Sequence, residues 1–212
     1  MIDTELQEKT AMLHRLVQEL KSAGRHDLLL QAIGVPTVEQ LGIEIAKASL
    51  SRIVITHDWH ILLPDYDKEL ELTPVHKAVY AFFLRHPEGL EFKQLSDYRD
   101  ELTRLYTSVL ETEIQPEKRG ILRRRKKIID PAQVRETIDR LVNPLDNAIN
   151  EKCSRIKATL ATLVDKYQLP YYIIAGHAVK HVEGSTRTWF ERKKVITIPR
   201  TLVTIDPSIA PN

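Results

Sequence analysis

The sequence predicts an α+β fold that is mostly helical, with a small helical segment followed by a larger domain. Three observations support this prediction. Capping boxes and helically spaced apolar residues fill the first 48 residues, and strand-like runs at 52–63 and 171–198 enclose further helical periodicity. A chain of 212 residues is long enough for one large domain or two small ones.

The N-terminal segment, residues 1–49, is predicted to form three short helices. Thr4-x-x-Gln7 and Thr37-x-x-Gln40 have the pattern of capping boxes, and apolar residues follow each at helical spacing. A segment of this size buries too little apolar surface to be stable alone. We therefore expect these helices to pack on the rest of the chain or on a second copy of it. We favour the second copy for at least one of them, which predicts a homodimer.

The second domain is predicted over residues 50–204, with a flexible tail over 205–212. The tail contains proline and little apolar sequence. The expected elements, in order, are strands over 52–56 and 59–63, helices over 75–85 and 92–109, an inserted basic loop over 111–143 in which a helix restarts at Asp130-Pro131, a long helix over 144–164, and strands over 171–176 and 194–198.

The long helix has an unusual polar face. Its apolar stripe contains Leu145, Ile149, Cys153, Ile156, Leu160 and Leu163, and its opposite face contains Asn147, Asn150, Glu151, Ser154, Arg155 and Ala158. Asn and Arg can each make two hydrogen bonds to base edges in the major groove of DNA. An ordinary amphipathic helix with a varied solvent-exposed face is the alternative.

Charge is distributed unevenly along the chain. The overall net charge is +2, but residues 1–70 contain 7 Lys/Arg against 11 Asp/Glu, whereas residues 118–194 contain 18 against 8. The most basic run, residues 118–127, includes Lys118, Arg119, Arg123, Arg124, Arg125, Lys126 and Lys127. This excess indicates a polyanionic partner. Nucleic acid, an acidic protein partner and a self-repelling loop without a partner all remain open for the run.

Short motifs in the second domain resemble the winged helix-turn-helix, and more specifically the effector domain of OmpR/PhoB-type response regulators. These motifs are Leu72-Thr73-Pro74 before an apolar helix, Arg85-His86-Pro87-Glu88-Gly89-Leu90 after it, and Ser154-Arg155-Ile156-Lys157 late in the long helix. The resemblance covers about residues 52–200 and implies a winged helix with an N-terminal β-hairpin and a C-terminal wing hairpin. The insertion at 111–143, the N-terminal helices and the lack of a receiver domain are departures from that family.

The resemblance also implies roles for individual residues. The helix over 144–164 would read duplex DNA in the major groove, with Asn147, Asn150, Ser154 and Arg155 as base or phosphate contacts and Lys157 on the backbone. The wing would bind phosphates or enter the minor groove through Arg187, Arg192, Lys193 and Lys194. A solvated strand edge with protective lysines is the alternative for this hairpin. Glu151 would be repelled by phosphates, so it must accept from a cytosine amino group or pair with Arg155, or the helix does not read DNA at all.

These observations together predict a DNA-binding protein, a dimeric transcriptional regulator, and not an enzyme, with no cofactor or metal. One alternative is a winged-helix scaffold for protein interactions in a larger assembly. A weaker alternative is a small metal-dependent nuclease or toxin-like enzyme that uses His57, Asp58 and His60. Three features favour a cytoplasmic location. The chain has a single Cys, residues 1–20 are charged rather than signal-like, and no apolar run is long enough to span a membrane.

Overall fold

The computed structural model describes residues 2–114, 129–181 and 189–209, which are predominantly helical with small β-sheets. The predicted α+β class with mostly helical content is therefore confirmed. The chain divides into two compact units, Met1–Ser49 and Leu50–Asn212.

The first unit contains three helices, α1 (Ile2–Ser22), α2 (His26–Ile33) and α3 (Val35–Ala48). The second capping box is not used, because α3 begins before it. Gly34, with φ of 80°, is the N-cap, and no side chain caps this helix. Several large apolar side chains of the unit are solvent-exposed, namely Leu6, Met12, Leu13, Leu16, Leu28, Leu41, Ile43 and Ile45.

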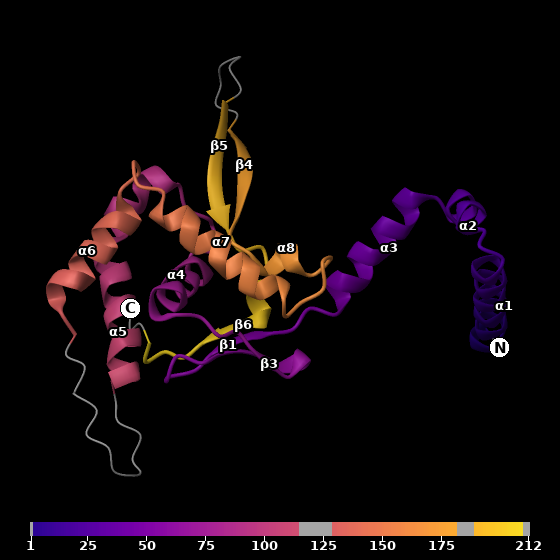
Figure 1. The fold of residues 1–212 in the computed structure, drawn as a ribbon, viewed down its shortest axis with the longest axis horizontal. Coiled ribbons are helices and arrows are strands. Elements are labelled where there is room, and N and C mark those ends of the chain that lie inside the picture. Colours follow the sequence, from indigo (N-terminus) through magenta and orange to yellow (C-terminus); the bar gives the residue numbers. More distant parts are fainter. Residues whose placement is uncertain (1, 115–128, 182–188, 210–212) are drawn as a thin grey trace, which may run out of the picture. The chain divides into compact units, whose positions relative to one another are not determined.

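A four-stranded sheet opens the second unit, with strand order β3-β2-β1-β6 (Figure 1). The predicted hairpin is present as β1 (Ile53–Ile55) and β2 (Ile61–Leu63), and β3 (Lys68–Glu69) extends it antiparallel to β2. The alternating burial along β1 and β2 places one face of the sheet on the core. The turn residue Trp59 is buried and donates from Nε1 to Ser108 Oγ at 3.1 Å, which ties the hairpin to a helix.

Residues 205–209 differ from the predicted flexible tail. The strand β6 (Val203–Ile205) pairs parallel to β1, and the amide of Asp206 continues the pairing by donating to the Ile55 carbonyl at 3.0 Å. Ile209 is 5% exposed and belongs to the core. A parallel strand pair joins distant parts of the chain, so local composition could not reveal it.

The core of the second unit is built around the helix α4 (Pro74–Arg85). Its residues from Ala78 to Leu84 are all buried. The predicted helix over 92–109 is instead a 3-10 helix, η2 (Phe92–Tyr98), followed by α5 (Arg99–Ile114). The aromatic ring of Phe82 contacts Phe83 and Tyr98 edge-on, which joins α4 to η2.

In the predicted insertion over 111–143, residues 111–114 and 131–142 are helical, and the helix restart predicted at Asp130-Pro131 is confirmed. The helix α5 continues to Ile114, and α6 (Pro131–Val142) packs against it. Asp130 caps α6 by accepting from the Ala132 amide at 2.9 Å, and Val134, Ile138, Leu141 and Val142 are buried. The apolar side chains of α6 therefore extend the core, which a solvated loop would not do.

The long helix is shorter than predicted. The helix α7 spans Ala148–Ala161 rather than 144–164, and Leu145 lies before it with 95% of its surface exposed. The rest of the predicted apolar stripe is confirmed, because Ile149, Cys153, Ile156 and Leu160 are buried and Leu163 packs against the core. The proline at position 144 lies in a turn, where the Asp146 amide donates to the Asn143 carbonyl.

The C-terminal hairpin is present, with strands shifted from the predicted positions. Residues 171 and 172 belong to a short helix, α8 (Leu169–Tyr172), and the hairpin consists of β4 (Ala175–His181) and β5 (Trp189–Val195). Tertiary contacts override local strand propensity at Tyr172, because its hydroxyl donates to the Ser51 carbonyl at 2.9 Å and its own carbonyl accepts from Tyr80. The turn predicted around residues 183–185 lies outside the described residues.

A third segment pairs with this hairpin at its base. Leu90 forms an antiparallel bridge with Lys194, with N–O distances of 2.9 and 2.8 Å. The preceding residue, Gly89, has φ of 72°, and a Cβ atom there would lie 3.1 to 3.3 Å from Val195, Lys194 and Lys193 atoms. Only glycine fits this approach without displacement. The break after α4 thus brings the chain onto β5.

No helix in the described ranges is both long enough and apolar enough to cross a membrane.

Candidate nucleic-acid interface

The helix α7 lies beside α4, close to the base of the β4–β5 hairpin (Figure 1). Its buried stripe fixes the opposite side toward solvent, where Glu151, Ser154, Arg155, Lys157 and Ala158 are exposed. A helix of 14 residues is about 21 Å long, which suits the major groove of DNA. The orientation of its polar side is therefore set by core packing.

The two asparagines predicted to contact bases are at the N-terminal end of α7. Asn147 is the N-cap and is therefore outside the helical face, and Asn150 is half-buried. The Nδ2 of Asn150 donates to Oδ1 of Asn147 at 3.0 Å. This contact orients both amides at the helix end, which is the part of a recognition helix that usually meets base edges.

Glu151 has a cation nearby on a different helix. Arg140 of α6 donates to Asp146 at 3.1 Å, and that hydrogen bond, followed by the charges of Asp146, Glu151 and Glu136, raises the pKa of Arg140. No ion pair joins Glu151 to Arg155 among the described side chains. The charge of Glu151 therefore acts on Arg140, and the Arg155 pairing, one of the alternatives left open for Glu151, is not formed.

The predicted wing residues have different environments. Arg192 is exposed, Lys193 is half-buried, and Arg187 lies outside the described residues. Lys194 is half-buried, and its ammonium lies 5.2 Å from the centre of the Phe92 ring. Because its backbone also pairs with Leu90, Lys194 connects the hairpin to the core, a role that the sequence did not predict.

The hairpin base and α7 are adjacent. Burial raises the pKa of the Cys153 thiol to about 12, while the nearby charge of Lys194 opposes this rise. The thiol is 7% exposed and points into the core, as the sequence predicted. Lys194, at the base of the hairpin, therefore lies close to Cys153 on the buried side of α7.

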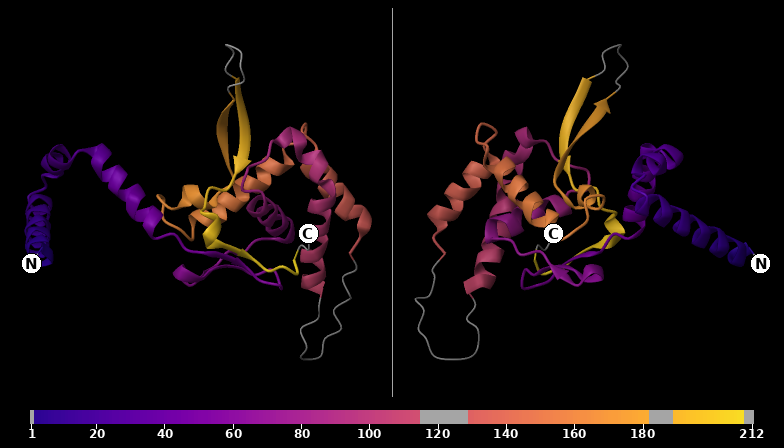
Figure 2. Two further views of the ribbon diagram at one scale, coloured as in Figure 1. Left: turned by 180° about the vertical axis from the view of Figure 1, so that it is seen from behind. Right: turned by 45° about the vertical axis from the view of Figure 1, so that its right-hand side comes forward.

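The basic run 118–127, with Arg123, Arg124, Arg125, Lys126 and Lys127, lies outside the described residues. The helix ends that lead to it are described. The C-terminal end of α5 and the N-terminal end of α6 point away from the β4–β5 hairpin in all views (Figures 1 and 2).

His57, Asp58 and His60 lie around the turn of the first hairpin. Asp58 accepts from Thr56 Oγ1 at 2.5 Å, and His60 contacts Glu69 through Nδ1 at 2.5 Å and Asp58 through Nε2 at 3.5 Å. The contacts of His60 join the turn to β3. Within residues 2–114, 129–181 and 189–209, no group of three or more His, Cys, Asp or Glu side chains is arranged to hold a metal ion.

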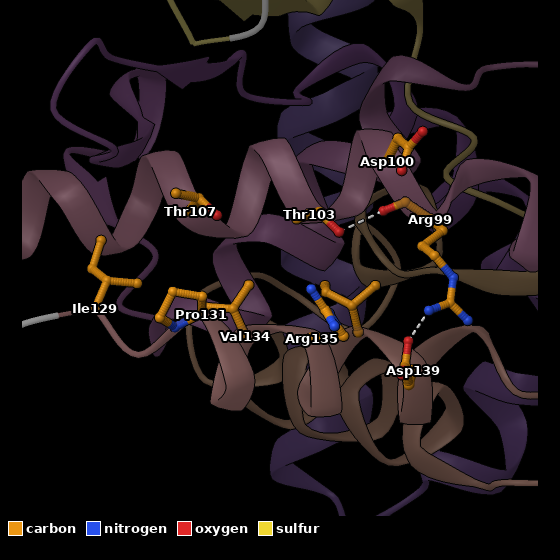
Figure 3. Close-up of a pocket in the computed structure, with 10 residues that line it drawn as sticks. Arg99, Asp100, Thr103, Thr107, Ile129, Pro131, Val134, Arg135 and Asp139 are labelled. Atoms are coloured by element: carbon orange, nitrogen blue, oxygen red, sulfur yellow. Dashed lines mark hydrogen bonds and ion pairs between the residues drawn. The ribbon is translucent and has the colours of Figure 1, made fainter.

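A groove of about 360 Å³ runs between α5 and α6 (Figure 3). Arg99 reaches across it to Asp139, and Thr103 donates to the Arg99 carbonyl at 2.8 Å. The remaining lining residues are Asp100, Thr107, Ile129, Pro131, Val134, Arg135 and Ile138. Charges of both signs surround the groove, and they select no class of ligand.

A charged cluster lies at the C-terminal end of α4. His86 contacts Glu88 through Nδ1 at 2.9 Å and Glu101 through Nε2 at 3.1 Å, while Arg85 donates to Glu101 at 2.9 Å. The imidazole also packs on Phe82, with 4.8 Å between ring centres. Burial lowers the pKa of His86, but the two carboxylate hydrogen bonds outweigh this and the pKa is raised.

Sequence reasoning missed two residues beside α7. His76 is in the first turn of α4 and is 6% exposed, and Lys152 is half-buried on α7. Burial lowers the pKa of His76 to about 4, and the charges of Lys152 and Arg155 lower it further. Spacing in the sequence could not show that these three residues are close, because α4 and α7 are separated by more than 60 positions.

Comparison of the chain with protein-family profiles, with curated proteins and with solved structures gave no match.

Proposed function

We propose that this protein is a cytoplasmic, double-stranded DNA-binding protein that regulates transcription. It would read the major groove with α7 and contact the backbone with the β4–β5 wing. The observation that carries this proposal is the exposed side of α7, where Ser154, Arg155 and Lys157 lie opposite a stripe fixed in the core. Base recognition requires such a side, because a helix must present hydrogen-bonding groups in a fixed orientation.

Electrostatics supports the same proposal. No carboxylate in the described residues pairs with Arg155, Lys157 or Arg192, whereas Glu151 is close to Arg140. A cation without an internal partner is available for a phosphate or a guanine. Arg155 would be the main specificity contact, Asn147 and Asn150 would contact bases at the helix start, and Lys157 and Arg192 would contact phosphates.

The proposed regulator is a homodimer. The exposed apolar residues of α1, namely Leu6, Met12, Leu13 and Leu16, support this assignment, because an apolar helix face gains stability when a second helix covers it. Two copies would also place two α7 helices on one duplex, as symmetric half-sites require.

The test is binding to fluorescein-labelled random duplex, measured by anisotropy over a series of salt concentrations. We expect affinity to fall steeply with salt, and Arg155→Ala to weaken binding by about 5- to 100-fold, equivalent to 1–3 kcal/mol. Arg135→Ala on α6 is the matched control, since it removes an exposed arginine outside α7 and the hairpin. Lack of a shift at low salt, or equal losses in both variants, contradicts the proposal.

The protein-interaction scaffold remains a second candidate, and one observation favours it. The run 118–127 concentrates Lys118, Arg119, Arg123, Arg124, Arg125, Lys126 and Lys127 within ten positions, a charge density that suits an acidic protein partner. Replacing Arg123, Arg124, Arg125, Lys126 and Lys127 with glutamine decides its role. An unchanged salt dependence of duplex binding would assign the run to a protein partner, whereas a strongly reduced dependence would assign it to DNA.

A further inference from the structure

The first turn of α4 has hydrogen-bond donors without acceptors. Thr73 is the N-cap, but its side chain makes no capping hydrogen bond to the helix backbone. Pro74 has no N–H, and the amides of Val75 and His76 have no recorded acceptor among the described residues. The amides at a helix N-terminus carry a partial positive charge and favour an anion.

The side chain of His76 adds a further unsatisfied group at the same turn. Its Nδ1 contacts Thr73 Oγ1 at 2.6 Å, so the hydroxyl that would cap the helix is used by the imidazole. Its Nε2 is buried and has no hydrogen-bond partner in the described residues, although the residue is 6% exposed. Leaving such an atom unsatisfied costs about 1–3 kcal/mol, which indicates a missing partner.

The charged groups near His76 define what that partner can be. The cations of Lys152 and Arg155 on α7 are close enough to act on its imidazole. Lys152 and Val75 also line one cavity, whose other walls come from α5, α6 and α7 and include the carboxylates of Glu136 and Glu151. Neither cation can accept a hydrogen bond, so when Thr73 donates to Nδ1, the Nε2–H requires an acceptor from outside.

We propose that the first turn of α4 and the adjacent flank of α7 form a binding site for one phosphate group. The amides of Val75 and His76 and the Nε2–H of His76 donate to its oxygens, and Lys152 and Arg155 neutralise its charge. Lysine and arginine side chains have enough rotatable bonds to turn aside and admit an oxygen to the covered Nε2.

The identity of the phosphate rests on the proposed function. When a recognition helix lies in the major groove, its flank is beside a phosphate of the DNA backbone. Helix N-termini commonly donate hydrogen bonds to backbone phosphates. Lys152 and His76 would then fix the register of α7 on DNA without reading bases. Free phosphate has the same chemistry and is the other source.

The first arm of the test uses the full chain with labelled duplexes of several sequences. Lys152→Gln should lower the slope of log affinity against log salt by about 0.9, the value for one phosphate, equally for all sequences. His76→Asn keeps an amide near the Nδ1 position but lacks Nε2, and it should weaken binding by about tenfold. Lys166→Gln, an exposed lysine beyond α7, is the matched control and should leave the slope unchanged.

The second arm uses inorganic phosphate and the ¹⁵N resonances of the protein. Phosphate should shift the His76 ring and the Val75 and His76 amides in the wild type, and not in Lys152→Gln. These shifts without duplex binding would support the site and contradict the DNA function. These shifts with an unchanged salt slope in Lys152→Gln would assign the site to free phosphate and overturn the DNA source. No shift together with an unchanged slope overturns the phosphate site itself, whether or not the protein binds DNA.

Discussion

Replacing Gly89 with alanine should lower the unfolding free energy of the second unit by about 2–4 kcal/mol. The left-handed conformation at φ of 72° costs a residue with a Cβ about 1–2 kcal/mol. The added Cβ also lies 3.1 Å from Val195 Cβ, 3.2 Å from the Lys194 carbonyl oxygen and 3.3 Å from Lys193 Cβ. These are atoms of the β5 main chain or directly attached to it, so relief requires movement of the strand, at about 1–2 kcal/mol.

The assay is urea unfolding of the full chain followed by circular dichroism. With a slope near 2 kcal/mol per molar urea, the midpoint should fall by about 1–2 M. Gly176→Ala on β4 is the matched control, because its Cβ would meet only the end of the Lys194 side chain at 3.8 to 3.9 Å and should be tolerated. A Gly89→Ala midpoint equal to that of the wild type would refute the close approach of the chain to β5.

Three further predictions concern groups whose environment the structure defines. The pKa of His86 is raised because hydrogen bonds to two carboxylates outweigh the effect of burial. The protonated imidazole therefore stabilises the folded protein fully below its pKa in the unfolded chain, about 6.5. This stabilisation is lost as pH rises through its pKa in the folded protein. Unfolding free energy should therefore decline from about pH 6 to pH 9, and His86→Gln should flatten this decline. Cys153, whose pKa burial raises to about 12, should react with a thiol reagent at least about 100-fold more slowly in the folded protein than in urea, and equal rates would contradict its burial. Ile209→Ala should lower the free energy of unfolding by about 2–4 kcal/mol because Ile209 is 5% exposed, while Pro207→Ala at an exposed position should leave it unchanged. Equal stability of the two variants would support the predicted flexible tail instead.

Local patterns were reliable where one element's own residues determine its structure. The stripe Ile149, Cys153, Ile156 and Leu160 indicated the buried side of α7 correctly, because apolar residues at helical spacing share one face in any surrounding fold. The same stripe failed at Leu145, since Pro144 and the Asn143 turn start the helix later. Periodicity identifies a face well and an end poorly.

Partners distant in the sequence were not predictable. Three contacts join segments more than 70 residues apart. Leu90 pairs with Lys194, the Lys194 ammonium lies over the Phe92 ring, and His76 is near Lys152. Asn147, Asn150, Ser154, Arg155 and Lys157 were proposed from the sequence, whereas Lys152 on α7 and His76 on α4 were not. Whether residues on two helices form one site depends on how the helices pack, which neither helix's own sequence specifies.

The sequence by itself determined the class of the fold, the first hairpin, the buried side of α7 and the excess of basic residues over 118–194. These properties depend on spacing and composition within single segments. The tertiary structure decided that residues 203–205 close the sheet beside β1, that Gly89 brings the chain onto β5, and that Lys194 connects the hairpin to the core rather than extending into solvent. Each of these points depends on which surfaces of the chain are buried against one another. That is a property of the packed chain and not of any one segment.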